Sequence, residues 1–212
     1  MSLGEVSQVS EGVYAYLQPD GSWYLNNTGF LAGRTGPRHH RRARAMPRGH
    51  PPHQGTPAHT TNDSIIHLPE RSVVFTGDLL FNGGTPFALQ GSVSGWIEVL
   101  GTVLRPLGAR TLVPGHGPVC GPEVIDDMLA YLRFVQQTAR RAKAAGLSPL
   151  EAARATDLGA FSDLLDSERI VGNLHRAYLE LEGADRGAPI DLVCVLGEMV
   201  AYNGGRPLSC HA

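Results

Sequence analysis

Three short motifs hold the side chains of this sequence that are best suited to chemistry. They are Ala58-His59-Thr60, Thr76-Gly77-Asp78 and Pro114-Gly115-His116-Gly117, and each lies at the end of a predicted strand. Imidazole nitrogen and carboxylate oxygen bind zinc and similar divalent metals. Glycine on both sides of His116 and before Asp78 allows sharp backbone turns that a side chain would obstruct. Two histidines and one aspartate in these motifs are therefore candidate ligands of a metal.

The pattern of apolar residues predicts the elements that must position these motifs. Strands are expected at 13–17, 22–32, 64–68, 72–76 and 111–113, and helices at 92–107, 122–145, from 148 onward and at 167–182. The turn sequence Pro19-Asp20-Gly21 joins the first two strands into a hairpin, and Ser148-Pro149-Leu150-Glu151 has the spacing of a capping box. The apolar stretch 189–201 is expected to pack on the body. Strands interleaved with helices indicate an α/β fold with function on its loops.

The charge of the chain is concentrated in one segment. Residues 34–58 contain six arginines, five prolines, four histidines and no acid, so this segment is +6 while the rest of the chain is 12 − 20 = −8. No helical or strand period survives there, which predicts disorder. The segment has no interleaved aromatic residues, so binding to nucleic acid is not expected.

Length and composition limit the number of domains and the cellular location to be expected. A chain of 212 residues suits a single domain. The start of the chain lacks a basic stretch followed by an apolar one, and no run of about 18 apolar residues occurs, so we expect a cytoplasmic protein without a membrane span. Cys120, Cys194 and Cys210 are widely spaced and form no CxxC pair, which favours inert, reduced thiols over a zinc ribbon or a redox pair.

The order of the motifs resembles the metallo-β-lactamase superfamily of metal-dependent hydrolases. "HT" before a strand, "FTGD" closing the next strand and "PGHG" after a helix and a strand are similar to the second half of that fold. The opening EGVYAYLQPDGSWYLNNTG is similar to its first hairpin. GDLLFNGGTPFALQGSVSGWIEVL and ERIVGNLHRAYLEL resemble uncharacterised hydrolases within the superfamily. The resemblance covers residues 5–33 and from 57 to the C-terminus.

The resemblance implies both a fold and a reaction. The fold would be an αββα sandwich in a single domain, 1–212, with its N-terminal half incomplete. His59 would bind a first metal, Asp78 would bridge two metals and His116 would bind the second, with Asp63 as a supporting residue. A metal-activated hydroxide would attack the carbonyl of a small-molecule ester, thioester, lactone or lactam. The complete family holds two zinc ions, with manganese or iron as alternatives.

The sequence departs from the family at its main signature. The string His-x-His-x-Asp-His is absent, and residues 34–58 stand where it belongs. The spacing of His39, His40, His50 and His53 does not reproduce it. We therefore expect one zinc or none, and the alternative to a hydrolase is an inactive remnant or a binding protein on the same scaffold. Arg, Pro, His, Gly and Ala are also what a GC-rich gene encodes out of frame, which suggests a frameshift, a deletion or a gene-model error.

Other residues with reactive or bulky side chains have simpler interpretations. His67 is expected to be a packed or surface residue of a strand, and His175 a residue of a helix surface. Trp96 lies on an apolar helical stripe and is expected in the core. His211 is expected in a disordered tail.

Overall fold

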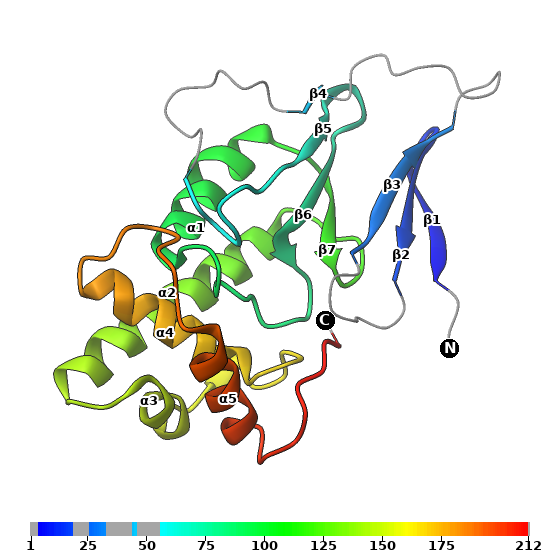
Figure 1. Cartoon of the computed structure of the whole chain (residues 1–212). Helices are drawn as coiled ribbons and strands as arrows, with labels where there is room; N and C mark the ends of the chain where they lie inside the picture. Colours follow the sequence, from blue (N-terminus) through cyan, green and yellow to red (C-terminus); the bar gives the residue numbers. More distant parts are fainter. Residues whose placement is uncertain (1–3, 19–25, 33–43, 46–55, 212) are drawn as a thin grey trace.

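The computed structural model describes residues 4–18, 26–32, 44–45 and 56–211, and these form two sheets and a layer of helices (Figure 1). The first sheet is antiparallel, in the order β1-β2-β3; the second has the order β4-β5-β6-β7 and is parallel only between β6 and β7. The strands are β1 (Glu5–Ser10), β2 (Val13–Leu17), β3 (Thr28–Leu31), β4 (Arg44–Ala45), β5 (Ile66–Leu68), β6 (Val73–Phe81) and β7 (Thr111–His116).

The predicted opening hairpin is confirmed in β2 and β3, which pair from Val13 opposite Leu31 to Tyr16 opposite Thr28. Alternation along β2 turns Val13 and Ala15 inward, where they are buried against residues of the second sheet. Gly29 lies opposite Ala15, and a Cβ there would come within 2.1 Å of the Phe75 ring. The missing side chain at Gly29 therefore allows the two sheets to approach each other.

The helices cover the face of the second sheet that points away from β1–β3 (Figure 1). Helix α1 runs on through a π-helical turn at Leu100–Leu104 and a 3₁₀ turn at Arg105–Leu107, and each predicted helix is confirmed within a few residues. Their bounds are α1 (Val93–Val99), α2 (Glu123–Ala144), α3 (Pro149–Ala155), α4 (Arg169–Leu181) and α5 (Leu192–Tyr202). The capping box is also confirmed: the Glu151 side chain accepts from the Ser148 N–H, and the Ser148 hydroxyl accepts from the Glu151 N–H.

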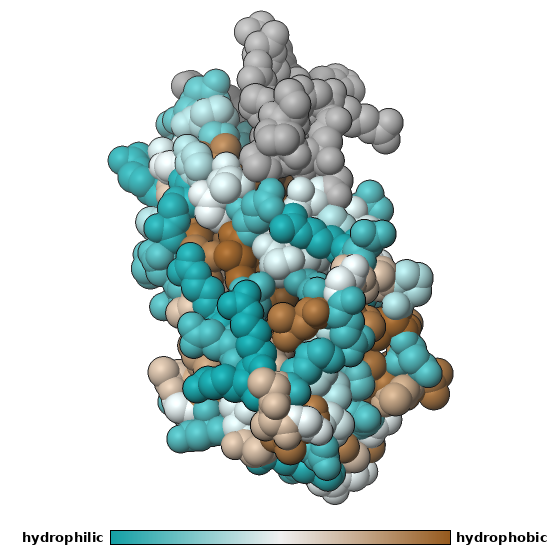
Figure 2. Space-filling model, turned by 90° about the vertical axis from the view of Figure 1, so that its left-hand side faces the viewer, coloured by the Kyte–Doolittle hydropathy of each residue, from teal (hydrophilic) through white to brown (hydrophobic). Residues whose placement is uncertain are grey.

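The fold is a mixed α/β sandwich with an incomplete outer layer, as the sequence predicted. No helix of the described residues covers the outer face of β1–β3, where Val6 and Phe30 are 54% and 45% exposed. From the helical side, the surface is mostly hydrophilic with scattered hydrophobic patches (Figure 2). Among the residues that the structure describes, no helix has the length and apolar character needed to cross a membrane.

Two strands extend beyond their predicted ends. β6 continues through Gly77 and Asp78 to Phe81, and β7 continues to His116. Gly77 has φ +52°, and the register of β6 with β7 shifts on both sides of it. The glycine therefore produces a bulge inside the strand rather than its end, which places Asp78 within the sheet.

Two segments predicted to be disordered contain ordered residues. Most of 34–58 lies outside the described residues, but Arg44–Ala45 pair with β5, and Ala58 is buried and accepts a hydrogen bond from the Ser92 N–H. His211 is held by contacts in the described tail, which differs from the prediction of disorder there. Its backbone N–H donates to the Asp166 carboxylate at 2.9 Å, and the neighbouring Cys210 is buried. These contacts come from residues far away in the sequence, which local composition does not reveal.

Candidate functional site

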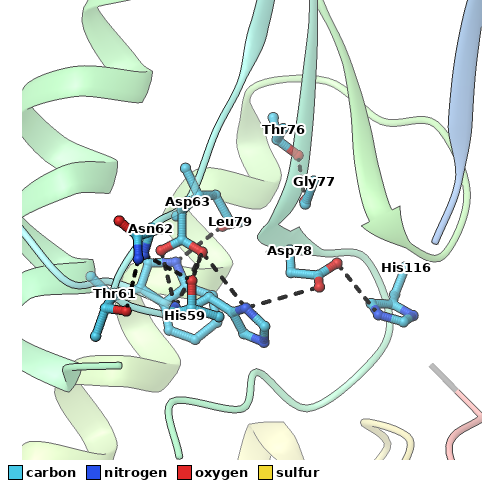
Figure 3. A network of polar contacts seen from close by, with 11 residues as sticks. His59, Thr61, Asn62, Asp63, Thr76, Gly77, Asp78, Leu79 and His116 are labelled. Atoms are coloured by element: carbon cyan, nitrogen blue, oxygen red, sulfur yellow. Dashed lines mark hydrogen bonds and ion pairs between the residues drawn. The ribbon is translucent and has the colours of Figure 1, made fainter. Parts of the chain in front are cut away.

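His59, Asp78 and His116 lie side by side in the structure (Figure 3). Asp78 is between the two histidines: its Oδ2 is 3.9 Å from His59 Nδ1, and its Oδ1 is 3.5 Å from His116 Nε2. The three residues come from the loop before β5, from β6 and from the end of β7. Each carboxylate oxygen of Asp78 therefore faces one imidazole.

The Asp78 carboxylate provides a test of whether these residues suit a metal. Its Oδ1 is buried and has no hydrogen-bond partner among the described residues, which is costly unless the atom binds something else. Two ligands on one tetrahedral zinc, at about 2.0–2.1 Å each, lie roughly 3.3 Å apart. The Asp78–His116 separation of 3.5 Å is close to that value, and the Asp78–His59 separation of 3.9 Å is somewhat longer.

The set of candidate metal ligands is nevertheless incomplete. In the part of the chain that the structure describes, no three His, Cys, Asp or Glu side chains are grouped closely enough to hold a metal together. Asp78 forms one pair of candidate ligands with His59 and another with His116. A catalytic zinc normally has three ligands from the protein. His39, His40, His50 and His53 lie outside the described residues.

Glycines let the β6 and β7 backbones approach each other at the site. A Cβ on Gly115 would come within 2.0 Å of Asp78 Oδ1, and a Cβ on Gly117 within 1.9 Å of the Asn82 carbonyl oxygen. Gly117 also has φ +87°, a conformation that other residues rarely adopt. The Pro-Gly-His-Gly motif is therefore glycine-rich because its loop lies directly against Asp78 and Asn82.

Asn27 connects the first sheet to the loop that carries His116, a role that the sequence did not reveal. Its side-chain amide donates to the carbonyls of Pro114 and Gly117 at 3.1 and 2.7 Å and accepts from the Gln18 N–H at 2.9 Å. Its backbone N–H donates to the Gly115 carbonyl at 2.8 Å. Asn27 thus bonds to the loop on both sides of His116.

We expect Asn27→Ala to lower the free energy of unfolding by about 2 kcal/mol, because it leaves partly buried backbone groups without partners. Urea unfolding would measure the change. Asn62→Ala is the matched control, since Asn62 is exposed and contacts only its own loop, so a change of at most about 0.5 kcal/mol is expected. Equal changes in the two variants would contradict the role assigned to Asn27.

His59 is positioned by a short turn and by aromatic rings. Asp63 accepts hydrogen bonds from the N–H and hydroxyl of Thr60, and its Oδ1 lies 3.8 Å from His59 Nδ1. The imidazole packs edge-on against Trp96 and tilted against Phe81, at centroid distances of 5.5 and 5.8 Å. Asp63 therefore lies beside His59, and Trp96 is in the core, as predicted.

A cavity of about 430 Å³ opens beside the three candidate ligands. Its lining consists of Asn26, His59, Thr60, Asp78, Phe81, Phe87, Leu89, Gln90, His116, Arg169, Leu192, Leu196, Leu208 and Cys210. This volume is in the range of small-molecule sites, roughly 300–1,000 Å³. Sequence reasoning identified the three candidate ligands but not the walls, which come from the segment after β6, from α4 and α5 and from the C-terminal tail.

One face of α4 holds the pocket wall in place. Arg169, Asn173, Arg176 and Glu180 follow the helical spacing i, i+4, i+7 and i+11, and the first three are buried. They form hydrogen bonds with backbone groups of residues 85–94. Arg169 donates to the Thr85 carbonyl and Arg176 to the Leu89 carbonyl. Asn173 donates to the Pro86 carbonyl and accepts from the Ala88 N–H, and Glu180 accepts from the N–H groups of Val93 and Ser94. A polar stripe on an otherwise apolar helix was the sequence signal for this role.

Arg169 also ties the C-terminal tail to the site. Its guanidinium forms a buried ion pair with Asp166 at 2.8 Å and donates to Cys210 Sγ at 3.0 Å. The same guanidinium lies 5.6 Å from the ring of Phe81, which stacks on His116 at 4.8 Å. The tail, the ion pair and the candidate ligand His116 therefore form one continuous set of contacts.

Among the residues that the structure describes, the other histidines and cysteines do not line the pocket, apart from Cys210. His175 on α4 contacts Glu198 of α5 at 2.7 Å, and His67 lies on β5, opposite Val74. Burial, together with a smaller effect of the nearby Glu123, raises the pKa of the Cys120 thiol to about 12, so its reactive thiolate form is disfavoured.

Comparison with known proteins agrees with the resemblance. Residues 17–116 match the model of the metallo-beta-lactamase superfamily. No curated protein matches the chain. Solved structures that match include the metallo-beta-lactamase FIM-1 from Pseudomonas aeruginosa in its mono-zinc form, with 24% identity, a TM-score of 0.35, and coverage of 38% of this chain and 37% of that chain.

Two further structures show the same partial coverage. A metallo-beta-lactamase from Erythrobacter litoralis is 20% identical over 38% of each chain, with a TM-score of 0.34. One from Pontibacter korlensis is 13% identical over 63% of this chain and 47% of that chain, with a TM-score of 0.35. The chain thus spans less than half the length of these structures. The match to the metallo-beta-lactamase superfamily model over residues 17–116 includes His59, Asp78 and His116.

Proposed function

We propose that this protein is a metal-dependent hydrolase that cleaves an ester, thioester, lactone or lactam, with His59, Asp78 and His116 as metal ligands. The observation that supports this best is the Asp78 carboxylate, whose two oxygens each face one imidazole while the buried Oδ1 has no hydrogen-bond partner among the described residues. The match of residues 17–116 to the metallo-beta-lactamase superfamily model also supports this reaction class. Zinc is the expected metal, with manganese or iron as alternatives.

A metal held by these residues would supply two things: a more acidic water and polarisation of the substrate carbonyl. The chain's own groups provide the surroundings. Asp78 lies between the two imidazoles, and Asp63 also lies beside His59. Phe81 and Trp96 pack against the histidine rings and exclude water from that side. The adjoining cavity is large enough for a small substrate.

A second candidate function is a binding protein or an inactive remnant on the same scaffold. The observation that favours it is the partial ligand set: within the described residues, no three metal-binding side chains are grouped together. The two candidates differ in one measurable property, which is whether the purified protein retains a metal through Asp78 and His116.

Metal content is the direct test of the proposed function. We expect the full-length protein, purified without chelators, to retain zinc in near-stoichiometric amount by elemental mass spectrometry. His116→Ala and Asp78→Ala should lose most of the zinc, because each variant removes one of the proposed metal ligands. His67→Ala is the control, since this histidine lies on β5 outside the pocket lining. A wild-type protein without metal, or equal retention by all variants, would favour the binding protein.

A further inference from the structure

The pocket has two kinds of wall. The candidate metal ligands come from the loop before β5, from β6 and from the end of β7, while the other walls are mainly hydrophobic. Phe87 and Leu89 come from the segment after β6, Leu192 and Leu196 from α5, and Leu208 from the tail. Apolar walls with a few converging polar groups are typical of sites that take a small organic molecule. These walls therefore carry information about the non-reacting part of the substrate.

Apart from the candidate metal ligands, the pocket lining provides few groups that could pair with a charged ligand. Arg169 is the one lysine or arginine among its described lining residues, and its guanidinium is already paired with Asp166 at 2.8 Å and bonded to the Thr85 carbonyl at 3.0 Å. A phosphate or carboxylate in this cavity would have to compete with Asp166 for that charge. An uncharged group has no such cost, because burying it needs no ionic partner.

The leucines of α5 form the rim of the cavity. Leu192 and Leu196 are separated by four positions and so lie on the same helix face, and they are 38% and 37% exposed while lining the pocket. A hydrophobic group that entered the pocket would cover the exposed parts of both side chains. Such burial contributes about 0.8 kcal/mol per methylene, which corresponds to about fourfold in affinity.

We propose that the substrate carries an uncharged apolar group, either a straight acyl chain of medium length or an aryl group, that packs against Leu192, Leu196 and Leu208. Its carbonyl would then lie beside His59, Asp78 and His116. This inference deepens the proposed hydrolase function and depends on it for the reacting carbonyl. The preference for an apolar chain depends only on the walls, so it can be measured without turnover.

The test measures binding of straight-chain alcohols to the full-length protein. N-phenyl-1-naphthylamine, a neutral dye that fluoresces in apolar surroundings, is bound first, and 1-butanol, 1-hexanol and 1-octanol are added as competitors. We expect competition to improve by about fourfold for each added methylene until the chain fills the pocket. Leu196→Ser and, separately, Leu192→Ser should weaken octanol binding about five- to tenfold.

Val193→Ser is the matched control, because Val193 lies on the same helix but is 84% exposed and outside the pocket lining. It should change octanol binding less than twofold. Competition that does not depend on chain length, or equal losses in Val193→Ser and both leucine variants, would overturn the inference. If alcohol binding follows the expectation but no metal is retained, the pocket inference holds and the hydrolase proposal fails.

Discussion

Replacement of Asp166 by asparagine is expected to lower the free energy of unfolding by about 3 kcal/mol. Asp166 and Arg169 form an ion pair with side chains only 1% and 2% exposed, so loss of the carboxylate charge removes a close negative charge from a buried guanidinium. Asparagine is the appropriate substitute, because Asp166 has φ +56° and asparagine tolerates this left-handed conformation. The variant therefore tests the charge rather than the backbone.

Urea unfolding of the Asp166→Asn protein would measure this loss. Asp163→Asn is a suitable control, since Asp163 is exposed on the same connection between α3 and α4 and its change should stay within about 0.5 kcal/mol. The double variant Asp166→Asn with Arg169→Met removes both charges and should recover part of the stability. If Asp166→Asn were as stable as the control, the ion pair would not link the tail to α4 in the way described above.

The second large effect is expected at Trp96. Its side chain is completely buried, its indole N–H donates to the Leu79 carbonyl at 3.1 Å, and its ring contacts His59 and Phe81. Trp96→Ala should therefore lower the free energy of unfolding by about 4 kcal/mol, because it leaves a large cavity and an unpaired carbonyl. The same cavity removes the support of the His59 ring, so metal retention should fall as well.

Trp96→Phe separates the two contributions. Phenylalanine keeps most of the ring packing but has no N–H, so a loss of about 1–2 kcal/mol is expected in urea unfolding, together with metal retention close to that of the wild type. If Trp96→Ala unfolded at the same urea concentration as the wild type, packing of Trp96 of α1 against the His59 ring would not contribute to stability. Unchanged metal retention in a destabilised Trp96→Ala protein would instead show that His59 does not depend on this contact.

The stability of the site rests on contacts between segments that are distant in the sequence. The α4 stripe reaches residues 85–94 from positions more than 80 residues later, and Asn27 reaches the His116 loop across a similar separation. These side chains were not predicted as functional. The spacing of Arg169, Asn173 and Arg176 shows only that one helix face is polar, and nothing local indicates which backbone groups that face will meet.

Sequence by itself predicted most of the strands and helices, an α/β fold and three candidate ligands, because alternation, helical period, capping and glycine-flanked polar residues are local properties. The sandwich class followed from the family resemblance. The hairpin of β2 and β3, helix α2 and the burial of Trp96 all followed from such patterns. Only the tertiary structure decided that β6 runs through Gly77 to place Asp78 within reach of His116, and that the tail returns to Asp166. The physical reason is that strand pairing and buried polar contacts depend on partners brought together by folding, which the order of residues along the chain does not specify.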